Sequence, residues 1–474
     1  MWRKRYPACA EDAGVVRRLP PTLLSLLFLL ELPFLDRRPL ARDEVVSTEV
    51  AHRTYHALWD ALGQIDAALG LYYALLHPFL AVSDTAFAAR LPSLLGMVVA
   101  AALLIRTATD RWGRRAGAFT GLLLLGNPVT WEFANIVRPY ALALALAAGT
   151  LHLVLLSRRR PVLLGLLALL LLYTQSLFVL LLLVELVVLA RRRQWQLVGA
   201  LTAAVVAWLP LLVVIIRQRR ETAWIPYTSP VAAAEQVHEF FGSDGLLSVV
   251  ALLVWGAIVA LGIRRHEVRR LLVAAALPAA LLALLGLRLH LFGTRYLLWT
   301  VLVIALAGGL SLARSSSPRL VAALSVALVL LAVASVVREA TIPYRLEDLP
   351  AASAYLAAHD RPGDAVLFSP DWARTSALPS LDSTPGVHVR DIALKHVGDR
   401  REAGYVYLPE YDMRTIEQRL GGHDRVWIVG YPKQDWAPTP NTSGALAQQL
   451  LRTWPTRQRA TFGQLEVRLL VRPS

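Results

Sequence analysis

The sequence is poor in cysteine, in lysine and in charge. Cys9 is the single cysteine among 474 residues, which excludes an internal disulfide and any metal site built on cysteine thiolates. Charged residues make up 18% of the chain, below the ~25% typical of soluble proteins. The carboxyl-terminal tail also has no Gly-rich phosphate loop, since its residues 361–364 (Arg-Pro-Gly-Asp) are typical of a plain turn before a strand. These absences exclude a disulfide scaffold and argue against an ordinary soluble enzyme.

Apolar residues dominate the chain instead. They account for 56% of it, and the mean hydropathy is +0.48. Runs of about 20 apolar residues can cross a bilayer. The eleven candidate spans lie at about 19–35, 88–105, 116–133, 140–157, 161–174, 177–190, 195–216, 245–263, 271–287, 294–312 and 319–337. The block 161–190 lies between two Arg triplets and is interrupted by Tyr173-Thr174-Gln175, which favours a hairpin of two short helices over one long span.

The net charge of +15 is compatible with a nucleic-acid partner until its location is considered. With the amino terminus inside, the cytoplasmic segments hold 21 basic and four acidic residues, against 11 and 12 in the outer loops. This distribution follows the positive-inside rule. It predicts a multi-pass plasma-membrane (inner-membrane) protein with a cytoplasmic amino terminus and no nucleic-acid partner. Because no small-x-small cleavage site follows the first span, we expect that span to be an uncleaved anchor.

Two domains are predicted. Residues 1–337 form a multi-span helical domain, and residues 338–474 form an extracytoplasmic soluble α/β domain. Within the second domain, strands are expected at 365–369, 425–431 and 464–471. Helices are expected at 351–359, 412–420 and 444–454.

The first outer loop, about 36–87, is long and carries apolar and aromatic residues at helical spacing. We expect its segments 44–59 and 69–80 to form interfacial helices. Asp43 and Glu44 open this loop. An adjacent carboxylate pair can act as a general base or hold a divalent cation, but it can equally serve as an acidic helix start. From spacing alone, the helix start is the favoured interpretation.

Several arginines stand on the outer side, against the positive-inside rule. Arg138 opens the fourth span and Arg295 the tenth. The planar fork of an arginine suits a phosphate, whereas the simpler interpretation is interfacial snorkelling. Glu31 and Glu185 lie within spans, but they are too few for the polar pathway and paired broken helices typical of a coupled transporter.

Taken in order, these features resemble a known family. The shared elements are Asp43-Glu44 just after span one, the Tyr72-Tyr73 pair, residues 89–93 (Ala-Arg-Leu-Pro-Ser), Arg138-Pro139-Tyr140, residues 224–226 (Trp-Ile-Pro) and Arg295-Tyr296. This set resembles bacterial GT-C glycosyltransferases, in the group of protein O-mannosyltransferases and aminoarabinose transferases (glycosyltransferase family 39 and relatives). The resemblance covers most of residues 19–337 and implies a GT-C-like transmembrane domain.

The resemblance further implies a polyprenyl-phosphate-linked sugar, mannose or a related hexose or pentose, as donor. The sugar would pass to a cell-envelope acceptor (protein, lipid or glycan) on the extracytoplasmic side. Asp43 would activate the acceptor hydroxyl, with Glu44 as the less favoured candidate. Arg295 and Arg138 would bind the lipid phosphate.

Four further residues are expected to bind substrate by the same resemblance: Asp66, Tyr72, Tyr73 and Tyr296. The sequence demands no cofactor, although a divalent cation remains compatible with the acid pair. Two other functions stay open. A transporter or flippase for a lipid-linked or polar substrate would show a polar pathway through the bundle. A non-catalytic envelope assembly protein would lack converging Asp and Arg side chains.

Overall fold

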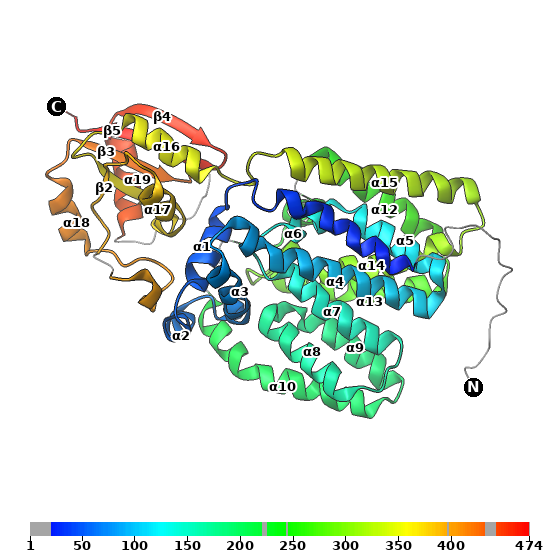
Figure 1. The fold of residues 1–474 in the computed structure, drawn as a ribbon. Helices are drawn as coiled ribbons and strands as arrows, with labels where there is room; N and C mark the ends of the chain where they lie inside the picture. Colours follow the sequence, from blue (N-terminus) through cyan, green and yellow to red (C-terminus); the bar gives the residue numbers. More distant parts are fainter. Residues whose placement is uncertain (1–19, 220–224, 243–244, 396–397, 432–441, 474) are drawn as a thin grey trace.

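The computed structural model describes residues 20–473 except 220–224, 243–244, 396–397 and 432–441. The basic leader with Cys9 therefore lies outside the described residues, as do Arg220 and Trp224. The chain forms a large helical bundle with a sheet domain at one end (Figure 1). Helices from the first outer loop lie between the two parts.

Among the described residues, five helices of the bundle are long and apolar enough to cross a membrane. They are α4 (Ala86–Trp112), α10 (Trp195–Arg217), α12 (Gly245–Gly262), α13 (His266–Gly286) and α15 (Pro318–Thr341). Four of them bury less than a third of their apolar window inside the protein and leave large side chains such as Val213, Leu277 and Leu330 exposed. Such broad apolar faces are typical of a surface that contacts lipid tails.

The remaining bundle helices are shorter. They are η2 (Pro21–Phe34), α5 (Arg114–Leu125), α6 (Pro128–Ala134), α7 (Tyr140–Leu155), α8 (Pro161–Thr174), η4 (Ser176–Phe178), α9 (Val179–Arg191), α11 (Pro230–Glu239), η6 (Thr294–Tyr296) and α14 (Trp299–Ala313). Every expected span coincides with at least one helix, while the number that cross the membrane remains a prediction.

One expected span is divided, and the expected hairpin is present. Segment 116–133 breaks at Gly126, and Asn127 starts α6 by accepting a hydrogen bond from the Val129 amide. This break directs the chain toward Arg138. Segment 161–190 forms two helices, as the hairpin prediction requires, with Gln175 in an extended conformation between them.

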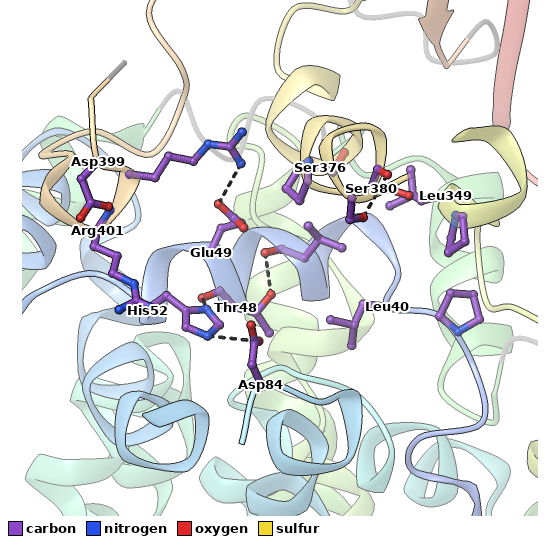
Figure 2. Close-up of a pocket in the computed structure, with 16 residues that line it drawn as sticks. Leu40, Thr48, Glu49, His52, Asp84, Leu349, Ser376, Ser380, Asp399 and Arg401 are labelled. Carbon is purple, nitrogen blue, oxygen red and sulfur yellow. Dashed lines mark hydrogen bonds and ion pairs between the residues drawn. The ribbon is translucent and has the colours of Figure 1, made fainter. Parts of the chain in front are cut away.

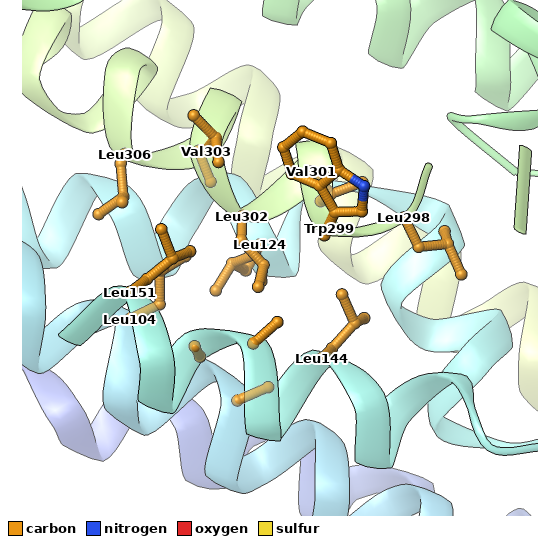
Figure 3. Close-up of a cluster of buried hydrophobic side chains, with 14 of the residues drawn as sticks. Leu104, Leu124, Leu144, Leu151, Leu298, Trp299, Val301, Leu302, Val303 and Leu306 are labelled. Carbon is orange, nitrogen blue, oxygen red and sulfur yellow. The ribbon is translucent and has the colours of Figure 1, made fainter. Parts of the chain in front are cut away.

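The bundle core is built from leucine, valine and alanine on facing helices. Figure 3 shows Trp299 and Leu302 of α14 beside Leu124 of α5, Leu144 of α7 and Leu104 of α4. All five are almost fully buried. Dense packing of this kind gives the loops at the end of the bundle a rigid base.

Residues 36–87, the expected first outer loop, fold into helices, as predicted, but the first of the two expected helical segments is divided. Segment 44–59 divides into α1 (Arg42–Ala51) and α2 (Tyr55–Gln64), and the Thr54 side chain caps α2. After Asp66 come η3 (Ala67–Leu69) and α3 (Gly70–Val82). Buried Val50, Leu58, Tyr73 and Leu76 pack these helices together.

The carboxyl-terminal domain is a three-layer α/β unit. Its sheet has the order β2-β1-β3-β5-β4, in which β2, β1 and β3 are parallel and β5 and β4 antiparallel. The strands are β1 (Ala365–Ser369), β2 (Arg390–Asp391), β3 (Arg425–Gly430), β4 (Thr456–Phe462) and β5 (Leu465–Val471). Helices α16 (Leu349–His359) and α17 (Ala373–Ser383) cover one face, and α18 (Met413–Leu420) and α19 (Ser443–Thr453) cover the other. The short helix η7 (Arg400–Glu402) belongs to a connecting loop.

The three expected strands and three expected helices of this domain are all present, within two residues of the expected bounds. The structure adds α17, β2 and β4. Helix α17 contains Pro379, and β4 is largely exposed along its length. Neither segment therefore shows the apolar pattern by which the others are recognised.

The sheet domain docks on the first outer loop through polar contacts. Arg400 lies 3.7 Å from the carboxylate of Glu49 on α1. The Thr54 amide donates to the Arg401 carbonyl at 3.0 Å, and the Gln64 side chain donates to the Gly404 carbonyl at 2.9 Å. Helix α1 consequently has the bundle on one side and the sheet domain on the other.

Candidate functional site

Three of the expected site residues meet at the start of α1. Asp43 Oδ2 lies 3.9 Å from a guanidinium nitrogen of Arg138 and 3.9 Å from one of Arg295. The Asp43 side chain is 36% exposed, so a substrate can still reach it. A carboxylate flanked by two guanidinium groups can accept a proton while the arginines bind an anion.

Each of the three side chains is fixed by its own element. Asp43 lies in the first turn of α1, where the helix dipole favours a carboxylate. Arg138 lies in the short connection between α6 and α7, where Ser93 of α4 donates hydrogen bonds to the carbonyls of Ile136 and Arg138. Arg295 belongs to η6, and its guanidinium lies 6.0 Å from the centre of the Tyr140 ring.

Electrostatics keep this cluster ionised. Burial favours the neutral form of Asp43, but Arg138, Arg295 and Arg42 outweigh it and lower the pKa of this carboxyl below its usual value. Burial also opposes the charge of Arg138, whose pKa is nevertheless raised by Tyr140 and by Asp43. At neutral pH Asp43, Arg138 and Arg295 therefore carry one negative and two positive charges.

Glu44 points away from this cluster although it is the next residue. It is fully buried, and its two oxygens accept from Nε and Nη2 of Arg90 at 2.9 Å each. They also accept from the amides of Ala41 and Val137, again at 2.9 Å. Burial raises the pKa of Glu44, but the adjacent Arg90 outweighs that effect and the net pKa is lowered.

Arg90 belongs to the motif 89–93, but its role as the partner of Glu44 was not predicted from the sequence. Besides Glu44, its guanidinium donates to the carbonyls of Leu35, Arg38 and Pro39 at 2.8 to 3.0 Å. It therefore holds the turn that leads into α1. The signal in the sequence was an arginine inside an apolar span, within the motif 89–93, where an unpaired charge is costly.

Asp66 adds a second carboxylate near Arg138. Its backbone is left-handed (φ 60°), a conformation that Asp tolerates better than most residues, and its Oδ2 accepts from the Tyr73 hydroxyl at 2.9 Å. Burial raises the pKa of Asp66, and Arg138 and Tyr73 only partly offset this. Tyr72 and Tyr73 are themselves buried on α3, whereas Tyr296 follows Arg295 in η6 and is partly buried.

The described residues contain no group of three or more His, Cys, Asp or Glu side chains close enough to hold a metal ion. His77, on α3, has its Nδ1 2.7 Å from the Ala51 carbonyl. A divalent cation would therefore depend on Asp43 together with ligands from the substrate.

A cavity of about 590 Å³ lies on the opposite face of α1 from Asp43. Figure 2 shows Thr48 and Glu49 of α1 and the adjacent His52 on one side of it and Ser376 and Ser380 of α17 on the other. Because residues two, five, six and nine places after Asp43 point away from it on a helix, the cavity and the carboxylate are separated by α1.

Comparison with known proteins gives a structural match only. No family model matches the sequence, and no curated protein does. Crystal structures of ArnT, an aminoarabinose transferase from Cupriavidus metallidurans, match over 94% of this chain and 97% of theirs at 15% identity. The TM-score is 0.58 for ArnT bound to undecaprenyl phosphate and 0.56 for the apo state. The chain has the GT-C fold. The fold predicted from the sequence, including the carboxyl-terminal α/β domain, is thereby confirmed.

Proposed function

We propose that this GT-C protein is an integral membrane glycosyltransferase that moves a sugar from a polyprenyl phosphate to a hydroxyl-bearing acceptor of the cell envelope. The observation that supports this most directly is Asp43, with Arg138 and Arg295 both 3.9 Å from one of its oxygens. A base for the acceptor and two cations for the leaving phosphate are the groups that such a displacement needs.

In the proposed reaction the acceptor oxygen attacks the anomeric carbon of the donor sugar. The new bond is carbon to acceptor oxygen, and the bond that breaks joins the same carbon to the phosphate oxygen. The proton of the acceptor hydroxyl goes to Asp43, and polyprenyl phosphate leaves with the bonding electrons. A single displacement of this kind inverts the anomeric configuration.

The two arginines would act on the phosphate. In the free protein Arg138 and Arg295 lower the pKa of Asp43 and so make it a weak base. A donor phosphate between the two arginines would offset their positive charge. The pKa of the Asp43 carboxyl would then rise toward a value better suited to proton transfer. Donor binding would thus prepare the base. Crystallised ArnT with bound undecaprenyl phosphate supports a lipid phosphate as the anion, as an analogy of fold.

Asp43, rather than Glu44, is our candidate for the base, because both Glu44 oxygens are occupied by Arg90 and by backbone amides. We assign Asp66, Tyr72, Tyr73 and Tyr296 to substrate binding beside the arginines. The donor sugar is proposed to be mannose or a related hexose or pentose. The reaction would take place on the extracytoplasmic side of the plasma membrane, with the amino terminus cytoplasmic.

The experiment uses membranes that contain the full-length protein, supplied with radiolabelled sugar on polyprenyl phosphate. Asp43→Asn keeps the size of the side chain but removes the base, so transfer should fall by about a hundredfold or more. Asp60→Asn on α2, an exposed acid away from the arginines, serves as the matched control and should retain full transfer. Full transfer by Asp43→Asn would remove Asp43 as the base, and no transfer by the wild type with any donor sugar would contradict the proposed function.

A further inference from the structure

The residue before Asp43 is held by the other domain. The guanidinium carbon of Arg42 lies 5.0 Å from the centre of the Tyr431 ring and 5.3 Å from that of Trp372. The two rings are stacked, with centres 5.2 Å apart and planes 19° apart. A cation this close to two aromatic rings is attracted by the negative charge density of both.

The backbone of Arg42 is held as well. Its amide donates to Oε1 of the buried Glu347 at 2.5 Å, and Glu347 lies in the segment that joins α15 to the sheet domain. At the same time Nε of Arg42 lies 3.6 Å from Oδ1 of Asp43. Arg42 therefore has the sheet domain on one side and the candidate base on the other.

The two rings come from one edge of the sheet. Trp372 follows the end of β1 and Tyr431 follows the end of β3, and these parallel strands pair so that Ser369 lies opposite Gly430. The carboxyl ends of parallel strands are where α/β sheets usually hold their ligands. Here the group held at that edge is an arginine of the membrane domain's own outer loop.

We propose that the sheet domain is a positioning element of the transfer site: Trp372 and Tyr431 grip Arg42, and Arg42 fixes Oδ1 of Asp43 while Arg138 and Arg295 fix Oδ2. The catalytic consequence of this inference rests on the proposed function. The contact of Trp372 and Tyr431 with Arg42, called the grip below, is independent of that function. Asp43 is then oriented from both of its oxygens, and small errors in such orientation are costly to catalysis.

The first experiment needs no substrate. Hydrogen–deuterium exchange is measured for peptides covering α1 in the full-length, detergent-solubilised protein and in the double variant Trp372→Leu/Tyr431→Leu. Trp454→Leu is the matched control, because Trp454 packs on Arg472 at 5.4 Å within the same domain. We expect faster exchange at the start of α1 in the double variant only. Equal exchange in the double variant and wild type would overturn the grip, and so would equal acceleration by the control.

The second experiment tests the link to catalysis. The titratable groups that interact with Asp43 are Arg42, Arg138, Arg295 and Asp66 of the bundle and its loops, together with Glu347 and Tyr431. Because Arg42 helps to keep Asp43 ionised, loss of the grip should move the acid limb of the pH–rate profile to higher pH. We expect the transfer rate at neutral pH to fall about tenfold with an unchanged donor KM. Arg42→Leu should give the same shift, and Arg42→Lys should partly restore the wild-type profile.

The two experiments separate the possible failures. If the double variant loosens α1 but keeps the wild-type pH profile, the sheet domain is only a docking partner and the positioning role is overturned. If the wild type transfers no sugar while the exchange result holds, the grip stands and the proposed function alone fails.

Discussion

Glu44 and Arg90 form a two-point ion pair that is fully buried, with both nitrogen-to-oxygen distances at 2.9 Å. The pair joins three segments, since Glu44 also accepts from the Val137 amide and Arg90 donates to carbonyls of the turn before α1. Asp43 immediately precedes Glu44, and Arg138 immediately follows Val137. The pair therefore fixes the distance between the candidate base and one of its arginines.

Breaking this pair should destabilise the protein strongly. Glu44→Leu leaves the Arg90 guanidinium buried without its counter-ion, and loss of one partner of a buried pair costs about 3–5 kcal/mol. We expect a clear drop in the thermal unfolding midpoint of the solubilised protein. Arg90→Lys should also lose stability, because an ammonium cannot replace the planar fork that serves five oxygen acceptors.

The control for Glu44→Leu is Glu267→Leu, which breaks the ion pair with Arg314 at the other end of the bundle. Both partners there are more than a third exposed, so the loss should stay within about 1 kcal/mol. Similar unfolding midpoints for the two variants would contradict the structural importance of the buried pair.

Asp43→Asn should bind polyprenyl phosphate more tightly than the wild type does. The carboxylate competes with the phosphate for Arg138 and Arg295, and the neutral amide does not. The measurement is titration of the solubilised variant with undecaprenyl phosphate, and we expect an affinity gain of about three- to tenfold. Weaker binding by the variant would indicate that Asp43 helps to hold the lipid, not to activate the acceptor.

Arg138→Ala and Arg295→Ala should both weaken donor binding, and Arg138→Ala should do so more. Arg138 is the less exposed of the two, at 15% against 34%, and its guanidinium also faces the Asp66 carboxylate. We expect the donor KM to rise about tenfold for Arg295→Ala and further for Arg138→Ala. Arg288→Ala, in the loop before η6, provides the control. A donor KM equal to that of the wild type in both variants would remove the phosphate-binding role.

Much of the fold follows from patterns along the chain. Apolar runs predict the bundle helices, and short β-rich segments between turns predict β1, β3 and β5. Helix α17 is not predicted because Pro379 interrupts its pattern, and β4 is not predicted because an exposed edge strand has no apolar face. The helix break at Gly126 depends on residues close by in the chain. The path from there to Arg138 depends on α4, whose Ser93 donates to the Ile136 carbonyl.

The candidate site could be predicted only in part. Arg138 and Arg295 are singled out by their charge on the expected outer side, and Asp43 by the family resemblance. The structure brings all three together. Asp43 and Glu44 are adjacent in the sequence but have different surroundings. This difference could not be predicted, because it depends on Arg90, which lies 46 residues after Glu44. Contacts with Trp372 and Tyr431 are more distant still and involve the second domain. Long-range partners of this kind leave no periodic signal in one sequence.

The junction between the domains should lose stability as the pH rises from about 4.3 to about 7. Burial raises the pKa of Glu347 to about 7, although its bond from the Arg42 amide and the charge of Arg42 oppose this. In the unfolded chain this carboxyl titrates near its ordinary value of about 4.3. The folded state therefore binds the proton more tightly, so the stabilising contribution is present at acid pH and is lost between those two values. Glu347→Gln keeps an oxygen that can accept from the Arg42 amide but removes the ionisation.

The measurement is the thermal unfolding midpoint of wild type and Glu347→Gln from pH 5 to pH 8. We expect the two proteins to differ little at pH 5 and the variant to be the more stable at pH 8. Asp348→Asn is the control for a neighbouring acid, since Asp348 caps α16 through the Ala351 amide and should show no such rise with pH. A variant that is less stable than the wild type at pH 8 would mean that Glu347 is ionised and stabilising there, held by Arg42 as an ion pair.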